Sequence, residues 1–511
     1  RGSGSICTRI PAILDSGFWI ALHDRLLFQS AVIRRMHRMG RPAFLLALLL
    51  RVCASEDAVD ALCGGLRVYV HRLPPPEWHA HEQGSFRDIG DHQLAQNRST
   101  ERGEGQESVV QEDLSLFGFP CTHFDPLTKM SCETLHYLGM GKPFKLRKLA
   151  AFEGFQFFAT HQFAMQVFAV RYVLNHCATE EVGDAQLFLV PLPLEMIQRE
   201  RQMMGKDTAR TEAYMAKVKH HLSRHPAWRQ RHGRDHLLVV SETLFMYRDN
   251  TRRSRLSGYT NADPFWESVA IWSIEGPRHD RVMNLPYLTF FHPKSDEEIA
   301  MWIHEVQKLP RERKVVLLAH ERPQRRGLIE ACRRSELCDR YEPYVGLDDM
   351  EPYEAVVTRY LRYTFALHPA GDTPTRRGFF DSIICGTIPI IFWTPEPTPL
   401  AGQVVDRTYE KCYGRVFQSF PGWLERVAFI ASSESDALRI VKEASDLEIE
   451  EKQRNMREFL PRVLYWDTRW KAESTEARHD LATQNPFAEA LREMKLHPFV
   501  GKRYGNETDQ L

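Results

Sequence analysis

The chain has 511 residues, which is too long for one ordinary hydrophobic core, so two domains are expected. Its 43% hydrophobic and 26% charged residues are ordinary for a globular protein, and its formal net charge is zero. Nucleic-acid-binding surfaces carry a basic excess because they neutralise phosphates, so this balance argues against a nucleic-acid partner.

The N-terminal region reads as targeting sequence. Residues 1–35 precede the first methionine and are expected to be a leader that is not native to the fold. From Met36, basic residues, an apolar run over 43–50 and small residues before Ser55 follow the plan of a secretory signal. That run is shorter than the roughly 20 apolar residues of a membrane span. Residues 36–54 are therefore predicted to be a cleaved signal peptide, with a short type II anchor as the alternative.

The cysteines and glycosylation motifs agree with the secretory pathway. Eight cysteines follow the signal, an even number that suits disulfides in an oxidising compartment. Their spacing contains no C-x-x-C pair, which argues against structural zinc, and their connectivity stays open. Asn97 and Asn506 begin N-x-S/T triplets and are predicted glycosylation sites.

Predicted strands and helices then alternate along the chain. A strand within 66–78 ends at prolines, and the polar segment 79–112 is predicted to be a disordered insertion. Apolar residues at helical spacing predict a helix over 152–177. Further strands are expected at 185–196, 234–242, 313–320, 363–369 and 387–393, and further helices at 325–337, 352–362, 374–385 and 434–464.

This alternation occurs in two successive halves, which is typical of two doubly wound α/β domains with Rossmann-like architecture. The N-terminal domain is expected over residues 60–285 and the C-terminal domain over 286–470. A tail follows over 471–511.

The stretch "HPAGDTPTRRGFFDSIICGTIPIIFW", residues 368–393, predicts a site between a strand and a helix. Thr373 is expected to cap a helix whose first residue is Pro374, and Gly386 is expected to end it. The free N–H groups of a helix start, together with Arg376 and Arg377, suit a phosphate.

The predicted nucleotide-binding set of this loop comprises Gly371, Asp372, Thr373, Thr375, Arg376, Arg377 and Asp381. Asp381 could hold a ribose hydroxyl. The alternative is that Arg377 and Asp381, four residues apart, only pair along the helix surface.

The same stretch resembles the nucleotide-sugar signature of the exostosin-like glycosyltransferases, with its P-x-G-D-[ST] loop, arginine pair, F-D and G-x-I-P. The segments "LRVYVHRLP", "GDAQLFLVPLPLEM" and "HPAWRQRHGRDHLLVVSE" resemble other parts of the family in the same order, over about residues 66–470. The R-R-x-x-F-D spelling leans toward the xyloglucan galactosyltransferase-like branch. Ala370, Thr387 and the residues after Trp393 depart from the family pattern.

The resemblance implies a GT-B fold, with two Rossmann-like domains facing a central cleft and a C-terminal helical tail. It implies inverting transfer of a sugar from a nucleotide sugar, usually a UDP-sugar, to a polysaccharide or glycan in the Golgi lumen. No D-x-D triplet occurs in the chain, which agrees with a site that needs no divalent metal and no other cofactor. A homo- or hetero-dimer with a related transferase stays open.

An inverting transfer also needs a general base, which is sought in the N-terminal half. Asp235 and His236 are the candidates, with the alternative that they only fix their loop. His161 and Glu275 are further candidates, and Trp228 could stack on a sugar or fill the core. Two other functions stay open: a GT-B transferase of another lineage, and a catalytically silent partner that stabilises an active transferase.

Overall fold

The computed structural model describes residues 61–74, 138–162, 164–192, 208–243, 263–276, 280–342, 351–370, 375–392, 408–470 and 480–495. The expected leader, signal segment and insertion, the acceptors Asn97 and Asn506, and loop residues 371–374 lie outside these ranges. The residues from Leu62 onward form one compact unit. Within the described ranges, no helix combines the length and apolar character needed to cross a membrane.

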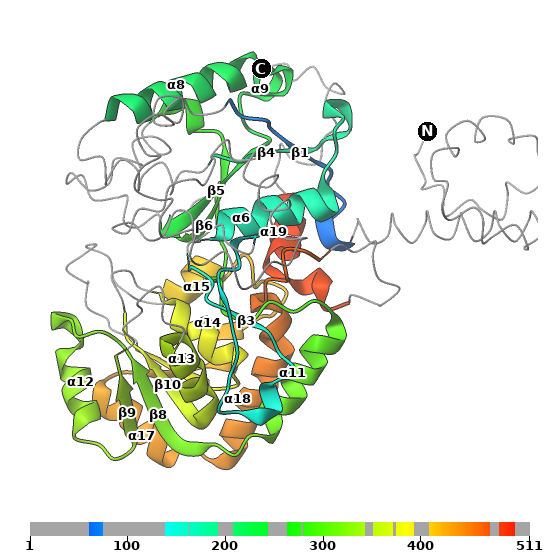
Figure 1. The fold of residues 1–511 in the computed structure, drawn as a ribbon. Helices are drawn as coiled ribbons and strands as arrows, with labels where there is room; N and C mark the ends of the chain where they lie inside the picture. The colour runs from blue at the N-terminus through cyan, green and yellow to red at the C-terminus, as the bar shows by residue number, and fades with distance from the viewer. Residues whose placement is uncertain are drawn as a thin grey trace, which may run out of the picture. The chain divides into compact units, whose positions relative to one another are not determined.

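The N-terminal half is built on a parallel sheet of five strands in the order β1-β4-β5-β6-β7 (Figure 1). The strands are β1 (Val68–Val70), β4 (Leu187–Val190), β5 (His236–Thr243), β6 (Ala270–Glu275) and β7 (Val282–Asn284). The helices described with it are α6 (Met165–Tyr172), α8 (Thr208–Arg224) and α9 (Pro226–Arg231). All four residues of β4 are buried, as expected for an apolar strand covered on both faces.

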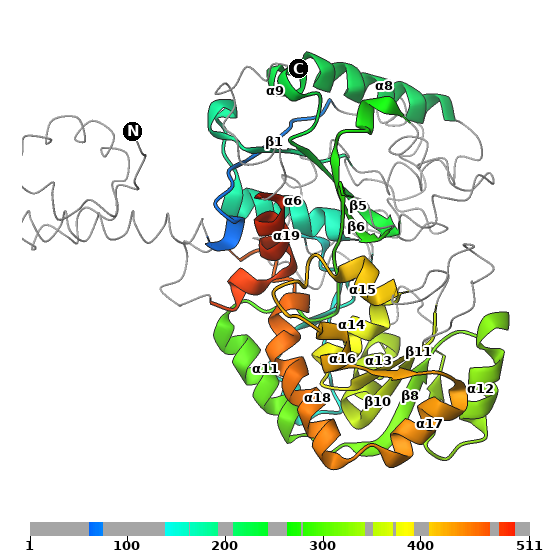
Figure 2. The ribbon, with the colours of Figure 1, turned by 180° about the vertical axis from the view of Figure 1, so that it is seen from behind.

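The C-terminal half is built on a second parallel sheet of five strands in the order β12-β11-β10-β8-β9 (Figure 2). The strands are β8 (Glu312–Leu318), β9 (Cys338–Tyr341), β10 (Tyr363–His368), β11 (Ile388–Phe392) and β12 (Phe429–Ala431). Its helices include α11 (Asp296–Lys308), α12 (Arg326–Arg333), α13 (Glu351–Arg362), α14 (Arg377–Ile384), α15 (Thr408–Tyr413) and α16 (Trp423–Val427). Two parallel five-stranded sheets confirm the predicted α/β class with two Rossmann-like domains, as in GT-B.

The chain reverses direction within the second sheet. After β8 it adds β9 on one side, and it then returns to add β10 on the other side of β8. The carboxyl ends of β8 and β10 therefore form a topological switch point, the position at which open α/β sheets bind ligands.

The helix predicted over 152–177 is wrong in its first half. α6 begins only at Met165, and Phe157–Phe158 forms a short strand, β3, paired with β2 (Pro143–Phe144). The ring of Phe157 lies 5.6 Å from that of Trp302 on α11. Burial against the C-terminal half therefore outweighed the helical spacing of these residues.

The single helix predicted over 434–464 is also wrong. The structure has two helices, α17 (Glu434–Glu443) and α18 (Asp446–Phe459). Ser445 starts the second one with a capping box, in which its side chain accepts from the N–H of Glu448 and the Glu448 side chain accepts in return. That reciprocal pair is a strong helix start in the middle of the predicted element.

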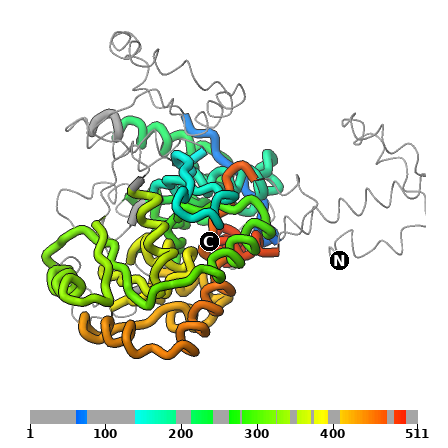
Figure 3. The backbone as a smooth tube through the Cα atoms, turned by 60° about the horizontal axis from the view of Figure 1, so that its bottom comes forward, coloured from blue at the N-terminus to red at the C-terminus, as the bar shows by residue number. Residues whose placement is uncertain are grey.

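The last described helix, α19 (Pro486–Lys495), returns to the N-terminal half. Phe487 stacks on Trp272 of β6, with ring centroids 5.8 Å apart. Gly64 has φ +60°, and a Cβ on it would lie 2.9 Å from the backbone of Arg492. In Figure 3 a red segment from the end of the described chain lies beside the blue segment from its beginning. The described part of the expected tail thus completes the N-terminal core.

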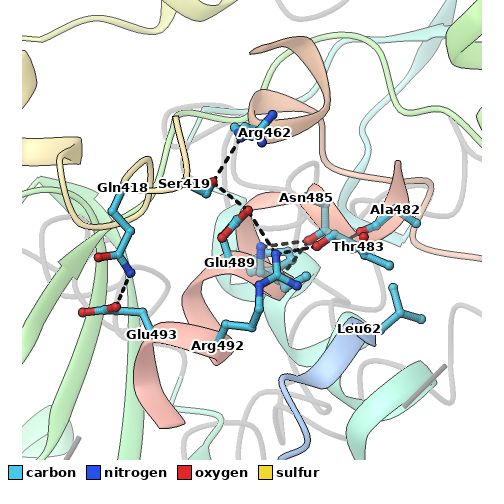
Figure 4. A network of polar contacts seen from close by, with 12 residues as sticks. Leu62, Gln418, Ser419, Arg462, Ala482, Thr483, Asn485, Glu489, Arg492 and Glu493 are labelled. Atoms are coloured by element: carbon cyan, nitrogen blue, oxygen red, sulfur yellow. Dashed lines mark hydrogen bonds and ion pairs between the residues drawn. The ribbon is translucent and has the colours of Figure 1, made fainter. Parts of the chain in front are cut away.

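The other side of α19 bonds to the C-terminal half (Figure 4). Glu489 accepts a hydrogen bond from Ser419 at 3.0 Å, and Ser419 accepts one from Arg462 at 3.2 Å. Gln418 donates to Glu493 one turn further along α19. α19 therefore joins the two halves through Gln418 and Ser419.

Two disulfides form among the described cysteines. Cys63–Cys177 spans a sequence separation of 114 residues, and Cys332–Cys338 spans only 6. Cys385 and Cys412 are buried free thiols. The two bonds agree with the expected oxidising compartment, and they supply a connectivity that cysteine spacing alone left open.

The two disulfides should differ in their contribution to stability. The entropy of loop closure predicts that Cys63→Ala/Cys177→Ala lowers the free energy of unfolding by about 5 kcal/mol and Cys332→Ala/Cys338→Ala by about 2 kcal/mol. Urea unfolding of the two double variants beside the parent measures both losses. Equal losses would contradict the assignment of the larger constraint to the long loop.

Candidate active site

Helix α14 follows the switch point and carries the arginine pair at its start. Its N-cap is Arg376, which makes no side-chain cap bond, and its first residue is Arg377. The predicted start at Pro374 with a Thr373 cap is therefore wrong by three residues. The backbone of Arg376 is extended, with φ −148° and ψ 145°, so the helix cannot include it.

The predicted end of this helix is confirmed. Gly386 has φ +70° and donates its N–H to the Ile383 carbonyl at 3.0 Å. Thr387 donates to the Ser382 carbonyl at 2.9 Å, which completes a Schellman motif.

Arg376 lies across the switch point. Its Nη2 donates to the carbonyl of Leu318, the last residue of β8, at 3.1 Å. Its Nη1 lies 3.5 Å from the carbonyl of Pro369, which follows β10. The guanidinium thus closes the gap between the two strand ends, and a side chain with five N–H donors keeps three beyond these two contacts.

A second arginine bridges the same two strand ends, and the sequence interpretation missed it. Arg325 is buried, and it donates to Ala370 O at 2.9 Å through Nε and to His320 O at 3.1 Å through Nη1. It follows β8 by seven positions, as Arg376 follows β10 by eight. The signal was therefore present in "RKVVLLAHERPQR", but using it required knowing that β8 and β10 are neighbours.

Arg377 connects its own helix to the N-terminal half. Its Nε donates to Asp381 Oδ2 at 3.2 Å, and its Nη1 donates to the carbonyl of Thr160 at 2.5 Å. Thr160 Oγ1 in turn contacts His292 Nε2 at 2.7 Å. The pairing considered as an alternative therefore forms, and one of the two arginines also bonds across the halves.

Asp381 is buried beneath this arginine. Burial raises the pKa of its carboxyl to about 6, although Arg377 works in the opposite direction. Its second oxygen, Oδ1, is buried and has no hydrogen-bond partner. Contact with a ribose hydroxyl stays a prediction for this residue.

Thr375 joins the arginines to the N-terminal sheet. Its N–H donates to Glu275 Oε1 at 2.8 Å, and its hydroxyl lies 3.0 Å from the hydroxyl of Tyr413. Glu275 is the last residue of β6 and is fully buried. His161, another base candidate, is half-buried and follows Thr160 directly. Glu275 therefore contacts the loop that carries Arg376 (residues 369–376, the arginine loop), and His161 is next in the chain to a residue that accepts from Arg377.

Asp235 and His236 lie elsewhere. They stand where β5 begins, at the amino edge of the N-terminal sheet, and both are completely buried. His236 Nδ1 lies 2.8 Å from Asp235 Oδ1, and Arg231 donates to Asp235 Oδ2 at 3.3 Å. An acceptor hydroxyl cannot reach side chains without exposed surface, so the geometry fits the alternative in which the pair fixes its loop.

Trp228 also belongs to the core. Its ring stacks on Phe265 at 4.3 Å and meets His236 edge-on at 4.7 Å. The side chain is buried, so it offers no open face for a sugar.

A cavity of about 330 Å³ lies at the opposite edge of the C-terminal sheet. Arg311, Thr364 and Gly386 are among its lining residues. They stand at the amino ends of β8, β10 and β11, so this cavity is separate from Arg376 by the length of the strands.

Several buried histidines stay neutral in the fold. Burial lowers the pKa of His71, His236 and His368 below the usual value, and it lowers that of His292 to about 4. His71 stacks on His236 with ring centroids 5.1 Å apart, so protonation of either would also repel the other.

The free energy of unfolding should fall as the pH falls below about 6.5, because these histidines bind protons in the unfolded state but stay neutral in the folded state. Each buried histidine lowers the free energy of unfolding by up to about 1.4 kcal/mol per pH unit. Asp381 acts in the opposite direction, because its raised pKa lets the folded state bind a proton first as the pH falls through 6. Four histidines outweigh this one carboxyl. Urea unfolding at pH 7.5, 6.5 and 5.5 measures the slope.

His71→Phe is a matched variant, since aromatic rings surround His71 and its Nε2 has no hydrogen-bond partner. It should reduce the slope while keeping the packing. A protein more stable at pH 5.5 than at pH 7.5 would contradict the assignment.

The sequence profile of the Exostosin GT47 domain matches residues 62–408. "Xyloglucan galactosyltransferase MUR3" of Arabidopsis thaliana is 25% identical over 352 residues, which cover 67% of this chain and 50% of that protein.

Two further Arabidopsis thaliana proteins match over shorter stretches. "Xyloglucan-specific galacturonosyltransferase 1" is 26% identical over 245 residues, which cover 46% of this chain and 36% of the relative. "Probable xyloglucan galactosyltransferase GT13" is 29% identical over 250 residues, which cover 46% of this chain and 51% of the relative. The matches thus span about a third to a half of each relative. Because the profile covers well over half of the chain, the chain belongs to the Exostosin GT47 family of glycosyltransferases.

Proposed function

We propose that this protein transfers a sugar from a UDP-sugar to a polysaccharide acceptor, with inversion at the anomeric carbon. The observation that carries the proposal is the pair of arginines, Arg325 and Arg376, at the switch point between β8 and β10. Ligands of open α/β sheets bind at this point, and a guanidinium matches a diphosphate in geometry and charge.

Negative charge builds up on the departing diphosphate during the transfer. The N–H donors of Arg376 beyond its two carbonyl contacts, and the positive end of α14, can stabilise that charge. The loop residues Gly371, Asp372 and Thr373 would add backbone donors, and Thr375 would position them, because its own N–H is donated to Glu275. No divalent metal or other cofactor is part of the proposal, because these groups supply the charge that a metal would otherwise provide.

The general base is expected among N-terminal residues near the arginines. His161 is better placed than Asp235 or His236, because it follows Thr160, whose carbonyl accepts from Arg377. It is half-buried, so an acceptor hydroxyl can approach it.

The acceptor class comes from the relatives, whose names assign them to xyloglucan. We extend this to a xyloglucan-like polysaccharide for the present chain. The two disulfides support work in an oxidising compartment, and the Golgi lumen is proposed. A dimer with a related transferase stays a prediction.

One observation favours the catalytically silent partner. Arg376 and Arg377 both donate to backbone carbonyls, so a structural role alone would account for these bonds. Such a partner would keep the fold and bind no donor.

Arg376→Ala should lower kcat/KM by about 10²- to 10³-fold, as loss of one donor to a developing anion typically does. The assay measures release of UDP from UDP-galactose, UDP-galacturonate, UDP-xylose, UDP-arabinose and UDP-glucuronate with xyloglucan oligosaccharides, with EDTA and with Mn²⁺. Arg326→Ala is the control, because Arg326 is exposed at the start of α12, the helix that follows β8. It should retain the parent rate.

Equal rates with EDTA and Mn²⁺ would support a metal-independent transfer. A folded, secreted protein that binds no UDP and turns over no donor would instead support the silent partner.

A further inference from the structure

The last residue of β6 meets the backbone directly ahead of the arginine pair. Figures 1 and 2 both show α15 between β6 and α14, and the hydrogen bonds among these elements converge on Thr375. Its N–H donates to Glu275 Oε1 at 2.8 Å. Its hydroxyl lies 3.0 Å from Tyr413, whose own hydroxyl donates to the Ile274 carbonyl at 3.0 Å. Ile274 and Glu275, the last two residues of β6, thus hold Thr375 of the arginine loop, Glu275 directly and Ile274 through Tyr413.

The Glu275 carboxylate is occupied on both sides. Oε1 accepts from Thr375, and Oε2 accepts from the hydroxyl of Tyr287 at 3.1 Å. The side chain has no exposed surface. A general base must accept a proton from a substrate hydroxyl within about 3 Å, and neither oxygen is open to one.

We propose that Glu275 is a positioning residue for the donor, which holds the loop so that Arg376 spans the two strand ends. This inference rests on the proposed function, since it assigns the residue a role in binding the nucleotide. The N-terminal half then determines the geometry of a site whose arginines belong to the C-terminal half.

The mechanism follows from adjacency along the backbone. Thr375 precedes Arg376, so a shift of the Thr375 N–H moves the guanidinium relative to the carbonyls of Leu318 and Pro369. Arg377 moves with it and loses alignment with Thr160. A misplacement of about 1 Å in such a site can cost about 100-fold in rate.

Two substitutions separate positioning from base catalysis. Glu275→Gln keeps an oxygen for the Thr375 N–H, and its NH₂ group can donate to Tyr287, because a hydroxyl can reverse its role from donor to acceptor. Glu275→Ala removes both bonds. If Glu275 is a positioning residue, the glutamine variant should keep its transfer activity and the alanine variant should lose it. If Glu275 is the general base, both variants should lose transfer activity.

The experiment measures UDP affinity by calorimetry, kcat and KM for donor and acceptor, and amide hydrogen exchange of the peptide containing residues 375–385. Glu275→Gln should stay within about threefold of the parent in all three. Glu275→Ala should weaken UDP affinity by about 10- to 100-fold, leave the KM for acceptor near that of the parent, and lose exchange protection in this peptide.

Glu489→Ala is the control for a loosened interface. Glu489 is also a nearly buried glutamate that joins the two halves, but it does so from α19, where it accepts a hydrogen bond from Ser419 and not from Thr375 (Figure 4). It should lower thermal stability while leaving UDP affinity and protection of residues 375–385 unchanged.

Two results would overturn the proposal. One is a fall in kcat of about 10²- to 10⁴-fold in both Glu275 variants with unchanged UDP affinity, which would make Glu275 the base. The other is an alanine variant with parental UDP affinity and parental exchange.

Failure of the proposed function looks different, because the parent itself would then bind no UDP. In that case the exchange data alone decide whether Glu275 holds the loop.

Discussion

The start of α14 is tied to the N-terminal half by two hydrogen bonds, from Thr375 N–H to Glu275 and from Arg377 Nη1 to the Thr160 carbonyl. Both lie in regions largely screened from water, where hydrogen bonds are electrostatically stronger and unpaired groups cost more free energy. These two contacts fix the position of Thr375 and Arg377 relative to the N-terminal half, and Arg376 lies between them. Polar groups at the carboxyl edge of the N-terminal sheet are thereby hydrogen-bonded to polar groups at the carboxyl edge of the C-terminal sheet.

The apolar cores of the halves are shared in the same way. Phe157 comes from the N-terminal part of the chain but packs on Trp302 of the C-terminal part. Conversely, Phe487 comes from the end of the described chain but packs on Trp272 of the N-terminal sheet. The connecting segment 285–292 is buried along its length, and Tyr465 of the returning chain donates to its Pro286 carbonyl at 2.6 Å. These contacts resemble a continuous interior more than the polar, loosely held interface typical of mobile domains.

Much of this architecture could be predicted from the sequence, because buried parallel strands appear as short apolar runs. β4, β10 and β11 fall inside runs identified in that way, β8 begins one residue ahead of its run, and the glycine that ends α14 was found from its position after the helix. What could not be predicted depends on contacts distant in sequence. The helix starts at Arg377 and not at the predicted Pro374. The loop before it is held by the hydrogen bond from Thr375 N–H to Glu275, a hundred residues earlier in the chain.

The base candidates Asp235 and His236 lie away from the switch point for a similar reason. "GRDH" marks the start of a strand, and ligands of parallel sheets gather where strands end, so the edge matters more than the residue type. Arg325 was missed because its importance comes from the order of strands in the sheet, which local patterns do not contain. Sequence patterns therefore located the elements well and their partners poorly.

The return of α19 to the N-terminal core has a consequence for biosynthesis. Phe487 and the backbone of Arg492, which pack on Trp272 and beside Gly64, are among the last described residues to leave the ribosome. At translation rates of about 5–20 residues per second, the N-terminal sheet waits on the order of ten seconds or more for the helix that covers it. During that interval its aromatic surface faces solvent, and the nascent chain is most exposed to misassembly. The first half of the protein is thus completed only after the second half has been synthesised.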